Sequence, residues 1–132
     1  MHEAFLKEIR AQLGEETDAF LKEMERPYAA SLRLNAFRPG VETLCLPYTD
    51  GQVDWCPDGR YIRPGVRPGL SPLQFAGAYY IQEASAMAPA MVLNVQPGEK
   101  VLDLCAAPGG KSGQLAAALR GEGLLVANEP EP

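Results

Sequence analysis

The sequence predicts an α/β protein in which a small α+β domain, residues 1–77, precedes the first β-α-β unit of a parallel sheet, residues 78–132. Three observations predict the second part. Val101 to Asp103 is an apolar strand pattern that ends in an acid, and a turn of small residues follows it. A helix pattern then begins near Lys111. A second apolar strand pattern, residues 124–126, follows that helix, and such alternation over short links is typical of a parallel α/β sheet.

Two helices are expected at the start of the chain. Residues 3–13 place apolar side chains four residues apart, which predicts a helix that ends at Gly14. Thr17 or Asp18 is expected to cap a second helix. Pro27 is expected to end it, because proline has no N–H and does not fit a helix interior. Together these two helices are expected to form a hairpin or a small cap.

Three short strands are predicted in the next part of the chain. Apolar and polar residues alternate from Ser31 to Asn35, as in a half-buried strand. Two further strands, residues 53–56 and 60–63, are expected on either side of Pro57-Asp58-Gly59, whose residue types favour a turn. The Pro- and Gly-rich segment 63–69 has too few apolar residues to pack, so it is expected to form a surface loop.

The elements around the small-residue turn follow in order. Ser71-Pro72 favours the start of a short helix, because serine caps helices and proline suits their first turn. Residues 79–81 are expected to be extended, and residues 84–95 to form a helix that Pro97-Gly98 ends. The helix after the turn is expected over residues 112–120.

Composition excludes several classes of protein. Hydrophobic residues make up 46% of the chain, which supplies a core, and no apolar run approaches the roughly 18–20 residues of a membrane span. No signal-peptide pattern is present, so a cytoplasmic protein without a membrane partner is expected. The three cysteines, Cys45, Cys56 and Cys105, have no paired spacing, and the only histidine is residue 2. Neither a disulfide framework nor a metal site is therefore expected.

The net charge of −5 argues against a protein that coats nucleic acid, but the charge is uneven. Residues 1–25 carry three basic and seven acidic side chains, and residues 26–77 carry six basic and four acidic ones. All six basic residues of the second segment are arginines, the type best suited to phosphate and base contacts. They are either ordinary surface charges or an RNA contact.

The turn after Asp103 is the strongest candidate for a functional site. Small residues there place backbone N–H groups and a helix N-terminus at the carboxyl end of a strand, where open α/β sheets bind nucleotide-like ligands. A phosphate-binding loop is disfavoured, because its first glycine position holds Cys105 and the carboxylate of Asp103 would repel a polyphosphate. A dinucleotide site remains a third option, although its G-x-G-x-x-G pattern is absent.

S-adenosylmethionine (SAM) fits the turn better. Its sulfonium is positive and it carries no phosphate, so an acid at the strand end is favourable. In the Rossmann-like SAM-dependent methyltransferases an acid is followed by alternate small residues, a register that Asp103, Cys105, Ala107 and Gly109 share. Such folds place a second acid after the next strand to bind the ribose hydroxyls, and Glu129 stands there.

The string Asp-x-Cys-Ala-Ala-Pro-Gly-Gly-Lys-Ser, residues 103–112, resembles the SAM-binding motif of the Sun-type RNA (cytosine-5) methyltransferases. Residues 80–87 look like the segment that precedes this motif in the family. Residues 31–35 and 55–59 are similar to the N-terminal part of its bacterial ribosomal-RNA members. The resemblance covers most of residues 26–132, and residues 1–25 fit the leading helices of the family.

The resemblance implies a set of cofactor-binding residues. Glu129 would hold the ribose, and the residues that would wrap the methionine and ribose of SAM are Cys105, Ala106, Ala107, Pro108, Gly109, Gly110 and Lys111. Lys111 either pairs with the SAM carboxylate or orients a catalytic acid, unless it is an ordinary surface lysine at the helix start. Gln82 and Ser85 either line the pocket or cap a helix.

The function that follows is formation of 5-methylcytosine in ribosomal RNA, with RNA as partner and SAM as cofactor. In the family a thiolate attacks C6 of cytosine, and the Asp-Pro-Cys and Thr-Cys-Ser segments that carry the catalytic groups do not occur in these 132 residues. The nucleophilic cysteine and the catalytic aspartate are therefore expected beyond Pro132. No catalytic residue is assigned, and this chain alone is expected to lack methyl transfer. The alternative is a non-catalytic RNA-binding module that uses the arginines of residues 26–77.

A sheet that ends after two parallel strands is expected to have an open edge and an uncovered apolar face. The chain is therefore expected to self-associate through this sheet. The residues expected on the uncovered face are Leu102, Leu104, Leu125 and Val126.

Overall fold

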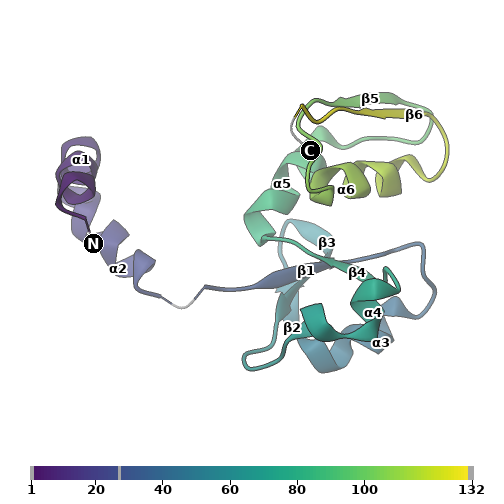
Figure 1. Ribbon diagram of the computed structural model, residues 1–132, viewed down its shortest axis with the longest axis horizontal. Coiled ribbons are helices and arrows are strands. Elements are labelled where there is room, and N and C mark those ends of the chain that lie inside the picture. Colours follow the sequence, from purple (N-terminus) through teal and green to yellow (C-terminus); the bar gives the residue numbers. More distant parts are fainter. Residues whose placement is uncertain (1, 27, 131–132) are drawn as a thin grey trace.

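The computed structural model describes residues 2–26 and 28–130. A two-helix arm, a four-stranded antiparallel sheet and a β-α-β unit follow one another along the chain (Figure 1). The α/β class and the β-α-β unit predicted from the sequence are confirmed. Among the described residues, no helix has the length and apolar character needed to cross a membrane.

The arm consists of α1 (Glu3–Leu13), the 3-10 turn η1 (Gly14–Glu16) and α2 (Thr17–Met24), and it stands apart from the rest of the chain in Figure 1. Gly14 ends α1 as predicted, at a φ of 52°. The predicted cap of α2 is wrong. No side chain caps its first turn, and the hydroxyl of Thr17 donates to the Gly14 carbonyl instead. The predicted role of Pro27 lies outside the described residues.

The antiparallel sheet has the order β2-β3-β1-β4. Its strands are β1 (Ser31–Leu34), β2 (Thr49–Val53), β3 (Cys56–Ile62) and β4 (Tyr79–Ile81). A short helix that the sequence did not predict, α3 (Val41–Cys45), is followed by the 3-10 turn η2 (Leu46–Tyr48). This helix completes the core of the sheet, whose buried members are Leu32, Leu34, Val41, Cys45, Ala78 and Tyr79.

The hairpin between β2 and β3 differs from the prediction. Its turn is Asp54-Trp55, and Pro57-Asp58-Gly59 lies inside β3, where the register of the two strands shifts. The proline is tolerated because β1 pairs with β3 only from Gly59 onward, so its missing N–H removes no bond to β1. Residues 57–59, which the sequence predicts as a turn, therefore form an irregular part of β3.

The chain then passes through η3 (Pro68–Leu70) and α4 (Pro72–Phe75) to β4, and α5 (Ala84–Leu93) leads to the second sheet. The hydroxyl of Ser71 accepts a hydrogen bond from the Leu73 N–H, which confirms the predicted cap. Strand β4 completes the first sheet although it follows residue 77 in sequence. The division into domains 1–77 and 78–132 stays a prediction.

The second sheet pairs β5 (Lys100–Asp103) with β6 (Leu124–Ala127) in parallel, and α6 (Gly110–Leu119) crosses between them. Val95, Leu115 and Leu119 form the core between the helices and this sheet. The prediction for Leu125 is wrong, because this residue is half-buried against that core. The predicted exposure is confirmed for the other three residues, Leu102, Leu104 and Val126.

Candidate cofactor site

The turn between β5 and α6 is fastened by Asp103. Its Oδ1 accepts a hydrogen bond from the Cys105 N–H at 3.2 Å, and its Oδ2 accepts one from the Ser112 hydroxyl at 2.6 Å. A bond from an aspartate to the amide two residues later is the usual Asx turn. The carboxylate thus ties the end of β5 to the first turn of α6, a role that the sequence interpretation did not assign.

Glu129 lies beside the same turn. Because parallel strands end at the same edge of a sheet, the chain after β6 runs next to the chain after β5. The Ala106 N–H donates to the Asn128 carbonyl at 3.0 Å, and the Ala107 N–H donates to Glu129 Oε2 at 3.0 Å. The structure therefore brings together the turn and the acid that the spacing placed there.

A cavity of about 210 Å³ lies between the turn and the first sheet. Six of the seven turn residues proposed for the cofactor line it, namely Cys105, Ala106, Ala107, Pro108, Gly110 and Lys111. Gly109 does not line it, and its φ of 104° allows the chain to enter α6. The opposite wall comes from Tyr80, Ile81, Gln82, Glu83 and Ala86. A larger cleft of about 530 Å³, beside Phe37 and Arg120, contains none of the turn residues.

Two residues that sequence reasoning missed hold the turn from the first sheet. The Tyr80 hydroxyl donates to the Pro108 carbonyl at 3.0 Å, and Nη2 of Arg33 donates to the Gly110 carbonyl at 3.1 Å. Arg33 precedes Gly110 by 77 residues, so no local pattern signals this contact. Gln82 lines the cavity and donates to the Ala86 carbonyl in α5. The capping alternative is wrong for it, because no side chain caps the first turn of α5.

The arrangement suits a ligand that approaches the backbone closely and carries an anionic group. The amides of Cys105, Ala106, Ala107 and Gly109 already donate to groups of the protein, so a ligand would meet the amides of the first turn of α6. Helix α6 points its N-terminus, the positive end of its dipole, toward the turn. Lys111, exposed in the first turn of α6, adds a cation. The Asp103 carboxylate, held in the loop by Cys105 and Ser112, adds a negative charge that disfavours a polyphosphate.

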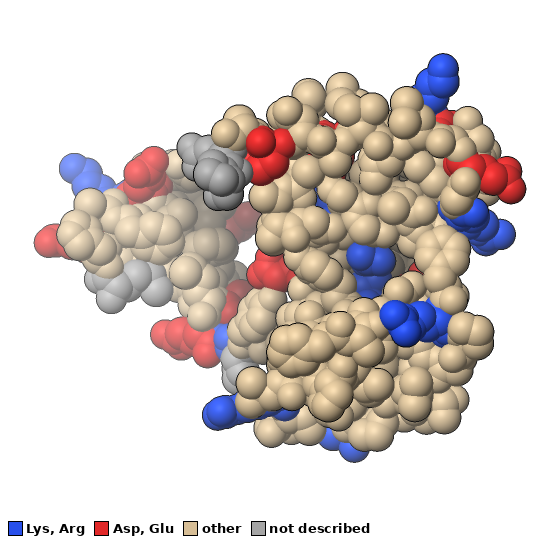
Figure 2. Space-filling model, turned by 45° about the vertical axis from the view of Figure 1, so that its right-hand side comes forward, with Lys and Arg blue, Asp and Glu red and all other residues tan. Residues whose placement is uncertain are grey.

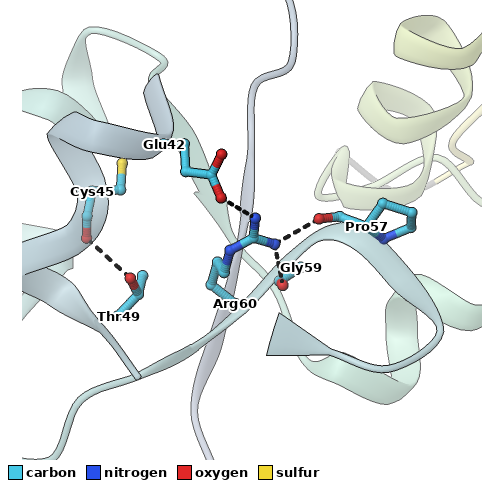
Figure 3. A network of polar contacts seen from close by, with 6 residues as sticks. All are labelled: Glu42, Cys45, Thr49, Pro57, Gly59 and Arg60. Carbon is cyan, nitrogen blue, oxygen red and sulfur yellow. Dashed lines mark hydrogen bonds and ion pairs between the residues drawn. The ribbon is translucent and has the colours of Figure 1, made fainter. Parts of the chain in front are cut away.

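Arg33 and Arg60, two of the six arginines of residues 26–77, are bound within the protein. Arg33 is buried, at 7% exposure. Arg60 donates to Glu42 at 2.7 Å and also to the carbonyls of Pro57 and Gly59 (Figure 3). On the face drawn in Figure 2, Lys and Arg side chains are spread among uncharged residues. These contacts weaken the alternative of a module that binds RNA through this segment.

In the part of the chain that the structure describes, no group of three His, Cys, Asp or Glu side chains is placed to hold a metal ion. Cys45 and Cys56 are buried free thiols, and Cys105 is an exposed one on the turn. The assignment of Cys105–Lys111 and Glu129 to a cofactor stays a prediction.

The catalytic groups are not located by the structure. Pro132 itself lies outside the described residues, which end at residue 130. The expectation that the nucleophilic cysteine and the catalytic aspartate follow Pro132 therefore stays a prediction.

Two family models match the chain. The N-terminal domain of 16S rRNA methyltransferase RsmF matches residues 1–84, and 16S rRNA methyltransferase RsmB/F matches residues 90–132. Ribosomal RNA small subunit methyltransferase F of Vibrio parahaemolyticus is 36% identical over 96% of this chain and 29% of its own length. The 26S rRNA (cytosine-C(5))-methyltransferase nsun-1 of Caenorhabditis elegans is 33% identical over 88% of the chain and 18% of its own length.

The solved structure of a methyltransferase homolog from Pyrococcus horikoshii aligns with a TM-score of 0.74 and 28% identity, over 96% of this chain and 48% of that one. The chain spans less than a third of the length of the curated relatives named here. Because the first model covers more than half of the 132 residues, the chain belongs to the family defined by the N-terminal domain of 16S rRNA methyltransferase RsmF.

Proposed function

We propose that this chain carries the cofactor-binding turn of a SAM-dependent methyltransferase that forms 5-methylcytosine in ribosomal RNA. The observation that carries the proposal is the cavity that the turn lines, together with Glu129, which accepts a hydrogen bond from the amide of the lining residue Ala107. The relatives named as rRNA methyltransferases support the reaction and the RNA substrate. A cytoplasmic location and an RNA partner belong to the same proposal.

The proposed roles follow from the positions of the residues. The amides of the first turn of α6 and the Lys111 side chain bind the methionine end of SAM, whose carboxylate suits this helix N-terminus. Glu129 stands after β6 beside the turn, where the resemblance places the acid that binds the ribose hydroxyls. The role of Asp103 is to shape the turn, through the hydrogen bonds that it accepts from Cys105 and Ser112. When bound, SAM supplies the methyl group, and this part of the chain binds and orients it.

The cofactor class is tested by titrating the ¹⁵N-labelled chain with SAM, ATP and NAD in parallel. We expect SAM to shift the amide signals of residues 105–107 and 109–111 and of Glu129, while ATP and NAD leave them in place. Lys111→Ala is expected to weaken SAM binding about tenfold, from loss of one charge-assisted contact. Lys100→Ala, on the exposed start of β5, is the matched control and should change nothing. ATP shifts at the turn would contradict the proposal.

The chain of 132 residues is expected to transfer no methyl group by itself. Its exposed thiol, Cys105, lies on the cofactor turn, and the resemblance places the nucleophilic cysteine in a Thr-Cys-Ser segment that this sequence does not contain. Incubation with ribosomal RNA and methyl-labelled SAM should leave 5-methylcytosine at the level of a protein-free sample. An excess of 5-methylcytosine, measured by mass spectrometry of the nucleosides, would refute this expectation.

A further inference from the structure

We propose that Arg33 is a positioning residue of the cofactor turn: from β1 of the antiparallel sheet, its guanidinium fixes the peptide between Gly110 and Lys111 and so orients the Lys111 amide. The inference rests on the proposed function, since it takes the turn as the place where SAM binds. Arg33 lies on the antiparallel sheet, outside the motif of residues 103–112.

The contacts of Arg33 are specific. Its Nη2 donates to the Gly110 carbonyl at 3.1 Å, and its Nε donates to Gln82 Oε1 at 3.0 Å. The residue is 7% exposed, which limits competition from water for these bonds. The guanidinium lies against the first turns of α6, since a Cβ at Gly113 would be 3.4 Å from Nη2. One guanidinium thus bridges the start of α6 and a residue of the cavity wall.

The bond to the Gly110 carbonyl acts on the next amide. In a trans peptide the C=O and the following N–H point in opposite directions within one plane. A donor that holds the Gly110 carbonyl therefore directs the Lys111 N–H away from Arg33. That N–H belongs to the first turn of α6, where the helix offers it no carbonyl, so it is available to a ligand in the cavity that Gly110 and Lys111 line.

A second donor on the neighbouring strand acts in the same way. Arg33 and Tyr80 are register partners on β1 and β4, and the Tyr80 hydroxyl donates to the Pro108 carbonyl at 3.0 Å. Two adjacent strands thus each supply one donor to one carbonyl of the turn. The antiparallel sheet serves as a platform that fixes the turn before a ligand arrives.

Fold stability alone does not favour this placement. Burial lowers the pKa of the Arg33 guanidinium, because desolvation disfavours its charge. Among residues 2–26 and 28–130, no carboxylate forms an ion pair with it, and the attraction of Asp58 offsets only part of the desolvation. It also stands at the positive end of α6, where a cation is repelled. A buried charge with these costs is a candidate for a functional role.

The test compares Arg33→Ala, Arg33→Lys and Tyr80→Phe in the 132-residue chain. Arg63→Ala is the matched control, because Arg63 also donates to a backbone carbonyl, that of Thr49, but does not touch the turn. Backbone ¹⁵N relaxation measures the order of the Gly109 and Lys111 amides without ligand. A SAM titration then measures affinity, and methylguanidinium is added to the Arg33→Ala variant to refill the missing group.

We expect the order parameters of the turn to fall from about 0.85 to below about 0.6 in Arg33→Ala and to recover with methylguanidinium. SAM affinity should fall about tenfold or more in parallel, less in Tyr80→Phe, and not in Arg63→Ala. Arg33→Lys keeps the charge but not the two-pronged geometry, so it should restore the fold and not the order of the turn. If Arg33→Ala unfolds the chain, the order parameters of the turn and the SAM affinity of Arg33→Lys and Tyr80→Phe test the assignment instead.

The assignment of Arg33 is overturned if the turn stays ordered in Arg33→Ala or Arg33→Lys. It is also overturned if methylguanidinium does not restore the order of the turn in Arg33→Ala. The failure of the proposed function gives a different result. In that case the turn still loosens and recovers, while SAM shifts no amide signal even in the unmodified chain.

Discussion

The three cysteines differ in burial, and their reactivity should differ accordingly. Cys45 and Cys56 are each 1% exposed, whereas Cys105 is exposed on the turn. Burial raises the pKa of both buried thiols, which lowers the fraction of reactive thiolate. With a disulfide reagent near pH 8, one thiol should react quickly and two only after denaturant is added. Cys105→Ala should remove the fast phase, and three fast thiols would contradict the structure.

The same two thiols predict a pH dependence of stability. A pKa raised by folding means that the unfolded chain loses these protons first as the pH rises. The stabilising contribution is therefore complete at neutral pH and is lost as the pH passes through the thiol range toward the folded-state pKa. Denaturant titrations should show a decline in that alkaline range that is smaller in a Cys45→Ala and Cys56→Ala double variant. An equal decline in both proteins would contradict the assignment.

At the scale of elements, β3 depends on Gly59. A Cβ at this position would lie 2.9 Å from Val53 Cβ and 2.9 Å from Met87 Sδ, and Val53 Cβ stands directly on the backbone of β2. Gly59→Ala should therefore lower the free energy of unfolding by about 1–3 kcal/mol, as overpacking does. Gly69→Ala is the control, because its Cβ meets only the end of the Ile81 side chain at 3.3 Å. Equal stability of both variants in denaturant titrations would contradict this packing.

Elements with a clear period or cap could be predicted from the sequence. Helix α1, strand β1 and the β5-α6-β6 unit carry such signals, and so does the turn with Glu129 beside it. Helix α3 has five residues, too few to show a period. The β2-β3 turn was misplaced because Val53 pairs with Cys56, which closes the hairpin before the Pro57-Asp58-Gly59 signal is reached.

The contacts between the two sheets could not be predicted. Arg33 and Tyr80 reach the turn only because β1 and β4 are neighbours in an antiparallel sheet whose order is not sequential. An arginine in an alternating strand pattern indicates a surface charge, and here the packing of α6 buries it. The sequence therefore identified the turn but not the platform that supports it.

At the scale of the whole molecule, the β5-β6 sheet has one covered and one uncovered face. Helix α6 covers Leu125, while Leu102, Leu104 and Val126 are 60%, 62% and 47% exposed. Parallel sheets are normally covered on both faces, and exposed strand edges pair readily with other chains. An apolar strip of this kind lowers its free energy when a second copy covers it, by about 25 cal/mol per Å² of apolar surface removed from water.

We therefore expect the 132-residue chain to associate as its concentration rises, which sedimentation velocity measures. Leu102 and Val126 are register partners, so Leu102→Glu with Val126→Lys places opposite charges side by side and keeps the strand pairing while it interrupts the apolar strip. This double variant should remain monomeric over roughly a hundredfold range of concentration. Leu70→Glu, at a residue 75% exposed in η3, is the control and should associate like the unmodified chain. A monomeric unmodified chain over that range would mean that this face does not drive association, since the apolar strip would then be too small or too interrupted to offset the entropy lost on assembly.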